Sequence, residues 1–441
     1  MDRKVIFQRL GILLAYPLAY AYIRLVFKFD PAAVPGPSFF DGKLTIALTY
    51  PVFALLFIAV NEIIRRGFRG AKSLPAKETV FWYIMTFLSG FTASLGPEPA
   101  LSVFAMHLCG VYSVLTSNGL LFGGKTSGFI PADLIHGFNV KAFAGFPNYI
   151  IDWRCFRKQR ADGEDSGGKR KSPLGAIIFV GIMGVLLIIS VSLMASIDED
   201  IGIFFDHLFS GFEVYLSELE LYEIIPRLIF AIPVCFYLYG LMSRSARSDG
   251  SREKRFASWL TGFMGRGKTV SSVIVYIAAG VFVLAYILFF IKRLAYMLGG
   301  FVGDVPDGML VSHYAREGFF ELVGIMAVNM CVYIAVILFG KTDTNGKFSV
   351  PAKILVTLLM AESIIFAVIA MSKLGLYYSI YGYTPKRILA MWATLALGFA
   401  AAMTIATVHR GKPHFRAGVI FTSISYIVIC VLSGVLVAVG A

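Results

Sequence analysis

Five arginines lie where apolar segments of this chain end, on what we predict to be the outer side of a membrane. The guanidinium group presents several N–H donors in one plane and binds phosphate or carboxylate oxygens in pairs. A pocket for an anionic ligand is therefore one interpretation of these arginines. Arginines that only extend to lipid headgroups or pair with a local acid are the alternative. The arginines concerned are Arg24, Arg227, Arg293, Arg316 and Arg387.

Two of these arginines, Arg316 and Arg387, each lie in a tyrosine-containing turn between apolar segments, which we call the first and the second corner. In the second corner, Thr384 and Pro385 have the residue types expected at the N-cap and the first position of a helix. The backbone amides at such a helix start attract anions. We therefore predict that Arg316 and Arg387 converge on one anion pocket, with interfacial anchoring by the tyrosines as the alternative. The candidate ligand-binding residues are Arg293, Tyr314, Arg316, Glu317, Tyr377, Tyr381, Thr384 and Arg387.

A second set of polar residues lies within or at the edge of the apolar segments. Glu362 and His107 lie near the middle of two of them, Asn329 lies within a third, and Glu321 lies near the start of that third segment. Ionisable groups at that depth are costly unless they face a partner or water. These four are candidates for a proton-accepting or ion-binding site. The alternative is a hydrogen bond that fixes helix packing.

Two stretches match the phosphate-loop pattern GxxxxGK[ST], at residues 119–126 (GLLFGGKT) and 262–269 (GFMGRGKT). That chemistry needs a strand before the loop, a helix after it and an acidic metal ligand nearby. Neither match has this frame, so we interpret both as accidental. No HExxH or GxSxG motif occurs, and we predict no metal and no cofactor. Catalytic residues cannot be assigned, and the sequence favours a protein that is not an enzyme.

The elements that must position these residues are membrane helices. The chain of 441 residues is 57% hydrophobic and only 15% charged, which excludes an ordinary soluble domain. We predict one all-α integral membrane domain over residues 1–441, a polytopic helical bundle with interfacial amphipathic helices at 131–157 and 201–219 and a mobile linker at 158–172. The eleven predicted spans lie near 10–27, 44–63, 79–96, 99–116, 173–196, 222–242, 270–291, 319–340, 352–371, 388–408 and 417–438.

The forty Lys and Arg residues indicate the orientation of these spans. Most fall on one side when the N-terminus is placed in the cytoplasm, as the positive-inside rule requires. We therefore predict a multi-pass protein of the bacterial cytoplasmic membrane with an uncleaved first span, a cytoplasmic N-terminus and an external C-terminus. The predicted partners are membrane lipids, with anionic lipid at the basic cytoplasmic loops. Nucleic acid is excluded because no basic folded domain is present.

Two motifs carry a family resemblance. Residues 312–322 (SHYAREGFFEL) follow a segment that ends in FFIKRLAYMLGG, and residues 376–389 (LYYSIYGYTPKRIL) contain the pattern Tyr-x-x-Tyr-Gly-x-Thr-x-x-Arg. Both resemble elements of a bacterial polytopic membrane family named domain of unknown function 4173, which is related to 4153. The resemblance is concentrated in residues 270–410. It implies a membrane helical architecture and no particular activity.

Three classes of function remain. The favoured one is transport or handling of an anionic or lipid-linked small molecule at the outer face of the membrane. The second is a sensor or scaffold for envelope machinery, with an envelope protein as partner. The third is a membrane-embedded transferase or hydrolase that acts on a lipid-linked substrate.

The orientation can be tested with cysteines introduced into intact cells. A cysteine at Asp206 should react with a membrane-impermeant reagent, because the segment 201–219 is predicted to lie outside. A cysteine at Gly167 should not react until the membrane is permeabilised, because its segment is predicted to be cytoplasmic. The opposite labelling pattern would show that the predicted orientation of the spans is wrong.

Overall fold

The computed structural model describes residues 3–26, 48–70, 76–96, 98–161, 224–266, 271–303, 305, 308–340, 349–411 and 413–439. Within these ranges the regular structure is entirely helical, with no strand. The predicted all-α class is therefore confirmed for them. The predicted span 173–196, the predicted helix 201–219 and residues 162–172 of the predicted linker lie outside the described residues.

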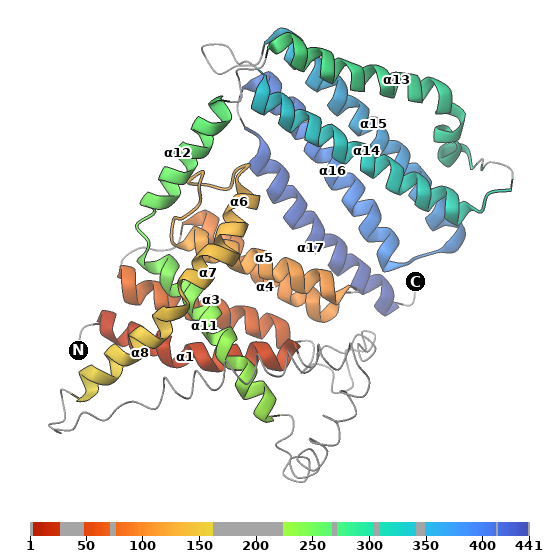
Figure 1. Cartoon of the computed structure of the whole chain (residues 1–441). Helices are drawn as coiled ribbons and strands as arrows, with labels where there is room; N and C mark the ends of the chain where they lie inside the picture. Colours follow the sequence, from red (N-terminus) through yellow and green to blue (C-terminus); the bar gives the residue numbers. More distant parts are fainter. Residues whose placement is uncertain are drawn as a thin grey trace, which may run out of the picture.

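The helices form an N-terminal and a C-terminal group (Figure 1). The N-terminal group also contains a π-helical turn, η2 (His136–Lys141), between α6 and α7. Its helices are α1 (Arg3–Val26), α3 (Thr49–Arg69), α4 (Lys77–Leu95), α5 (Pro99–Ser117), α6 (Ile130–Ile135), α7 (Ala142–Ala144), α8 (Phe146–Ala161) and α11 (Ile224–Arg247). α12 (Ser251–Arg266) leads to α13 (Ser272–Val302), α14 (Val311–Phe339), α15 (Val350–Tyr381), α16 (Pro385–Arg410) and α17 (Phe415–Val439).

Eight helices in the described part of the chain are long and apolar enough to cross a membrane. Each predicted span except 173–196 falls on a helix, but α3 and α4 do not meet the apolar criterion. A multi-pass membrane protein is thus supported, and the count of eleven stays a prediction. The eight helices are α1, α5, α11, α13, α14, α15, α16 and α17.

The C-terminal helices are longer than the predicted spans. α15 has 32 residues, which corresponds to about 48 Å at 1.5 Å per residue, whereas a hydrocarbon core is about 30 Å thick. Its start is fixed by Ser349, whose side chain accepts a hydrogen bond from the backbone of Ala352, and it ends at Gly382. The extra length brings residues 372–381 into the helix, beyond the predicted limit at 371.

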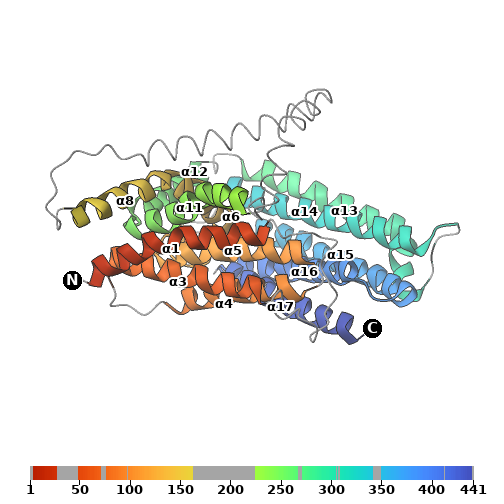
Figure 2. The same cartoon turned by 90° about the horizontal axis from the view of Figure 1, so that it is seen from below.

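α17 joins the two groups, and Figures 1 and 2 both show it beside α16 and near α4. Tyr426 and Ile427 of α17 are buried in one cluster with Trp82 and Tyr112. The hydroxyl groups of Ser102 and Tyr426 are 3.0 Å apart in this buried contact. Polar and aromatic packing therefore holds the last helix against the first half of the chain.

α12 is attached to the N-terminal group through a buried acid. Glu253 forms ion pairs with Lys141 and with His136, whose Nε2 lies 3.2 Å from the carboxylate. Burial raises the pKa of Glu253, but the hydrogen bonds from His136 and Lys141 outweigh it, and the pKa is lowered to about 2. The carboxylate is therefore ionised near neutral pH and fixes the first turn of α12 to the segment that contains η2.

The described residues of the two phosphate-loop matches do not have the geometry of a phosphate site. In residues 119–126, the backbone N–H of Phe122 donates to Asp133 at 2.8 Å and that of Thr126 donates to Glu78 at 2.6 Å. Two carboxylates of the protein thus occupy amides that would face a phosphate. The second match begins inside α12, because residues 262–266 are helical. The interpretation of both matches as accidental is supported by this geometry.

Two glycines allow α11 to contact the segment between α7 and α8. A methyl group on Gly240 would lie 2.6 Å from the carbonyl oxygen of Ala142, and one on Gly145 would lie 2.2 Å from the carbonyl oxygen of Gly240. Backbone atoms cannot yield as a flexible side chain does. Glycine is therefore required at both positions for this approach.

Replacing Gly240 with Ala should lower the stability of the detergent-solubilised protein by about 1–3 kcal/mol, because overpacking forces the backbones apart. Gly324→Ala is the matched control, since a methyl group there meets no atom within 4 Å. Thermal unfolding monitored by fluorescence would compare the variants. A Gly240→Ala protein as stable as the control would contradict the close approach.

Candidate functional site

Lys373 of α15 is the most unusual charged group in the C-terminal helices. Its side chain has 0% exposed surface, and its Nζ has no hydrogen-bond partner among the described residues. The ammonium lies 3.7 Å from the ring centre of Tyr296 and 4.1 Å from that of Tyr314. Aromatic faces attract cations, and this attraction strengthens when water is excluded. The two rings therefore offset part of the cost of burying the charge.

The space for this lysine is made by two glycines. A methyl group on Gly318 of α14 would lie 2.6 Å from Nζ of Lys373, and one on Gly300 of α13 would lie 2.9 Å from its backbone nitrogen. The cage is held by the hydroxyl of Tyr314, which donates to the carbonyl oxygen of Tyr296 at 2.6 Å. Three helices, α13, α14 and α15, thus meet around one ammonium group.

Other charges surround the cage at a greater distance. The guanidinium of Arg293 lies 5.5 Å from the ring centre of Tyr296. Glu321 is near enough to attract the Lys373 ammonium electrostatically, whereas Arg293 repels it. Glu321 is exposed and forms no ion pair with the lysine in the described structure. The positive charge of Lys373 is therefore only partly balanced.

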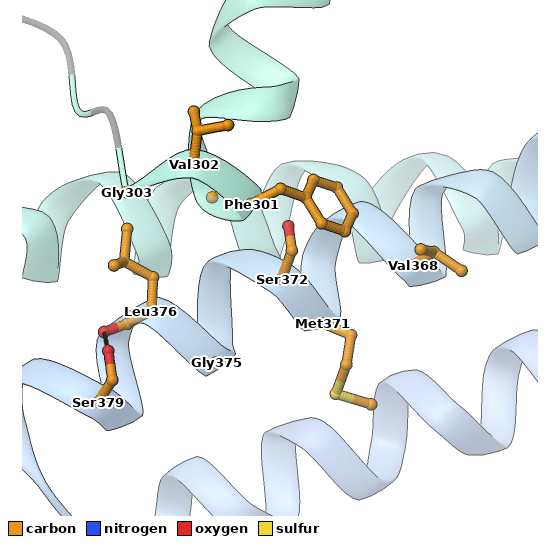
Figure 3. Close-up of a pocket in the computed structure, with 10 residues that line it drawn as sticks. Phe301, Val302, Gly303, Val368, Met371, Ser372, Gly375, Leu376 and Ser379 are labelled. Atoms are coloured by element: carbon orange, nitrogen blue, oxygen red, sulfur yellow. Dashed lines mark hydrogen bonds between the residues drawn. The ribbon is translucent and has the colours of Figure 1, made fainter.

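An open groove lies along α13 and α15 beside the cage. Its volume is about 660 Å³. Figure 3 shows the Phe301 ring beside Ser372, whereas the Val302 side chain points away from α15. The hydroxyls of Ser372 and Ser379 donate to carbonyl oxygens of their own helix, at 2.8 and 2.9 Å. The groove thus offers an apolar surface. Its lining residues are Gly300, Phe301, Val302, Gly303, Val368, Met371, Ser372, Gly375, Leu376 and Ser379.

Lys373 and the groove are in contact through the backbone. Ser372, which lines the groove, directly precedes Lys373, and Gly300 contacts both residues. The ammonium itself points to the α14 side of this contact. A buried charge acts strongly over several ångströms because little water screens it. The groove therefore lies within the field of a cation whose charge is only partly balanced.

Arg387 of the second predicted corner has a local role. Its guanidinium lies 4.0 Å from the ring centre of Tyr377 and 5.7 Å from that of Tyr381. It also donates to the carbonyl oxygens of Tyr381, at 2.9 Å, and Gly382, at 2.6 Å. These contacts close the C-terminal end of α15, where cations are favourable. Gly382 allows the turn through its positive φ of 72°.

The rest of the predicted anion pocket is not assembled by contacts in the described structure. Thr384 is the N-cap of α16, as predicted, but its side chain makes no capping hydrogen bond. Arg316 is exposed, and Glu317 lies beside His313 at 3.3 Å. No described hydrogen bond or ring contact joins Arg316 to Arg387. Their convergence on one ligand stays a prediction.

Glu362 and Asn329 lie deeper in the C-terminal group. Asn329 donates to the hydroxyl of Ser363 at 2.9 Å and to the carbonyl oxygen of Leu359 at 3.3 Å. Glu362 is buried, and its Oε2 has no hydrogen-bond partner among the described residues. Asn329 thus joins α14 to α15, as the packing interpretation predicts, whereas Glu362 keeps its place as a candidate proton acceptor.

His107 belongs to the other half of the molecule. Its Nδ1 lies 2.6 Å from the carbonyl oxygen of Val103, and its Nε2 lies 2.9 Å from the hydroxyl of Tyr22. A carbonyl oxygen can only accept, so Nδ1 donates to Val103 in this contact. His107 also lines a small cavity of about 50 Å³. Both ring nitrogens thus have a partner within the N-terminal group, and a proton-accepting role for His107 stays a prediction.

Lys373 and Tyr296 were absent from the residues selected by sequence. Lys373 falls just beyond the predicted span 352–371 and so resembles one more residue of an outer loop. The available signal was the positive charge of Lys373. A lysine at the outer end of a span opposes the positive-inside rule, as the candidate arginines do. Tyr296 carries no charge and gives no such signal. Within the described residues, no three His, Cys, Asp or Glu side chains are placed to hold a metal ion.

The helical organisation has a counterpart among protein families. The family model for a domain of unknown function, DUF4153, matches residues 79–438, which is most of the chain. The chain belongs to the DUF4153 family. The predicted membership of an uncharacterised family is thus confirmed, but the family that matches is 4153, the predicted relative, and not 4173 itself. The match covers α4 to α17 and therefore includes Lys373 and its cage.

Other comparisons add no assignment to this DUF4153 protein. Neither the curated proteins nor the solved structures contain a significant match. The site must therefore be interpreted from its own chemistry.

Replacing Lys373 with Met should stabilise this DUF4153 protein by about 1–4 kcal/mol, because Met fills similar space without a buried charge. Thermal unfolding in detergent would measure the change. Lys386→Met, at an exposed lysine, is the control and should stay within about 0.5 kcal/mol of the parent. Destabilisation by Lys373→Met would show that the cation is needed for packing.

Proposed function

We propose that this DUF4153 protein holds an anionic amphiphile, a lipid or a lipid-linked molecule, in the groove between α13 and α15. The observation that carries this proposal is the buried ammonium of Lys373, which has no hydrogen-bond partner among the described residues. A membrane protein that used the position only for packing would gain stability from an apolar side chain. Retention of a costly charge is typical of functional sites in membranes.

The groove and the charge have complementary tasks. The apolar walls formed by Phe301, Val302, Val368 and Leu376 suit hydrocarbon. Lys373 supplies positive potential beside the groove, and Arg293 adds to it. An amphiphile with a negative head near Lys373 and its chain along α15 would satisfy both. A neutral lipid would gain only the apolar part.

We place this site at the outer face of the bacterial cytoplasmic membrane. The positive-inside distribution of Lys and Arg supports this side, since α13 and α15 would both end there. Transport or handling of the amphiphile at this face is the activity that we propose. Glu362 lies deeper on α15, and its Oε2 has no hydrogen-bond partner among the described residues, so it is a candidate proton acceptor for such movement.

Binding of fluorescent phosphatidylglycerol and phosphatidylcholine analogues to the detergent-solubilised protein would test the proposal. The parent should prefer phosphatidylglycerol. Lys373→Gln should weaken phosphatidylglycerol binding about tenfold or more, as loss of a charged partner does, and should leave phosphatidylcholine unchanged. Gly375→Leu should weaken both lipids, because an added Cβ at Gly375 meets no protein atom and the side chain would fill the groove.

Matched controls separate these effects from general damage. Lys386→Gln removes an exposed charge near the start of α16, and Gly324→Leu adds the same side chain at an open position of α14. Both should bind as the parent does. Equal binding of the two lipids by the parent, or a Gly375→Leu protein with full affinity, would contradict the proposal.

A further inference from the structure

α12 is a helix with no place in the bundle as a membrane span. Its 16 residues would extend about 24 Å, which is less than the hydrocarbon thickness of about 30 Å. Figure 1 shows α12 crossing the direction of α16 and α17 instead of running beside them. A helix in this orientation lies along the plane of a membrane whose normal follows the spans.

One side of α12 carries an aromatic stripe. Phe256, Trp259 and Phe263 are 41%, 56% and 59% exposed. Their rings follow one another at centroid distances of 5.6 Å, and the Trp259 and Phe263 rings are stacked. At 3.6 residues per turn, the three positions fall within about 60° of one another. The stripe is therefore continuous and largely uncovered by the described protein.

Basic residues accompany the stripe at its N-terminal end. By the same geometry, Arg252 falls in line with the stripe, and Arg255 falls about 70° from its centre. Both are exposed. Lys254 is also exposed but falls on the opposite side of the helix. Aromatic rings with flanking arginines are the composition of helices that lie at the surface of anionic membranes.

The orientation of the stripe is fixed by Glu253. This buried residue is paired with Lys141 and His136 and turns one side of α12 toward the protein. Phe256 contacts Phe122 at a centroid distance of 4.8 Å and marks the edge of that packed side. The helix can therefore neither rotate freely nor bury the stripe against the described bundle.

We propose that α12 is a membrane-surface helix that binds anionic lipid of the cytoplasmic leaflet. Phe256, Trp259 and Phe263 would enter the boundary between headgroups and acyl chains, and Arg252 and Arg255 would contact phosphate groups. This site is separate from the groove of α13 and α15. It explains the basic charge of this loop without a nucleic-acid partner.

The test uses the full-length protein in vesicles of phosphatidylcholine, with and without phosphatidylglycerol. In a chain whose exposed Cys155 and Cys331 are changed to Ser, Trp259→Cys would carry an environment-sensitive fluorophore. Lipids with a spin label on the acyl chain should quench this probe more strongly when phosphatidylglycerol is present. The same probe at Lys254→Cys should be quenched by aqueous iodide instead.

Charge variants give the second readout. Arg252→Gln and Arg255→Gln should each reduce the ratio of membrane-inserted to water-exposed probe at position 259 about fivefold. This is the effect of one basic residue at an anionic surface. Lys254→Gln should leave it unchanged. Quenching that does not depend on phosphatidylglycerol would overturn the anionic-lipid assignment. A probe at 259 that is open to iodide in both vesicles, or shielded from both quenchers by a protein contact, would overturn membrane insertion.

Discussion

Backbone polar groups inside a bilayer must form their hydrogen bonds within the chain, and this constraint governs the structure more than any single contact. It forces the apolar segments to be helices, because no water is present to satisfy a strand edge or an open loop. Once the backbone is satisfied, the remaining freedom lies in how closely the helices approach and how their polar side chains are paired. Gly240, Gly300 and Gly318 set the first of these. They allow contacts that any side chain would prevent.

Buried charges in this protein are treated in two ways. Glu253 is paired with Lys141 and His136, and the buried Asp133 and the half-buried Glu78 accept backbone N–H groups of residues 122 and 126. Lys373 and Glu362 are also buried, but Nζ of Lys373 and Oε2 of Glu362 have no hydrogen-bond partner among the described residues. The paired group builds the junction that carries α12. The unpaired group lies in the C-terminal helices, which is why we place function there.

Membership of the DUF4153 family joins both regions in one module, because the matched residues 79–438 include α12 and the groove. In our proposals the two regions contact lipid on opposite sides of the same membrane. One would hold a single amphiphile, and the other would fix the bundle to an anionic surface. α17, packed on Trp82 and Tyr112, connects the helices that carry them.

The sequence by itself determined the helical membrane class, most span positions and the turns at Thr384 and Gly382. These depend on local composition and on residue types with strong backbone preferences. It also indicated that Glu362 and Asn329 would be buried, and that the phosphate-loop matches lacked their structural frame. Hydropathy, however, could not give the full length of α15, because polar residues near a span end resemble a loop.

Only the tertiary structure decided which polar residues share a site. Arg387 is a candidate for anion binding, and the structure adds that its Nη1 donates to the carbonyl oxygens of Tyr381 and Gly382. His107 and Glu362, both predicted as intramembrane polar groups, lie in different halves. Lys373 was passed over, although it is enclosed by Tyr296, Tyr314 and Gly318 from two other helices. The physical reason is that helix periodicity fixes which side of a helix a residue occupies, whereas the partner of that side depends on packing between segments far apart in the chain.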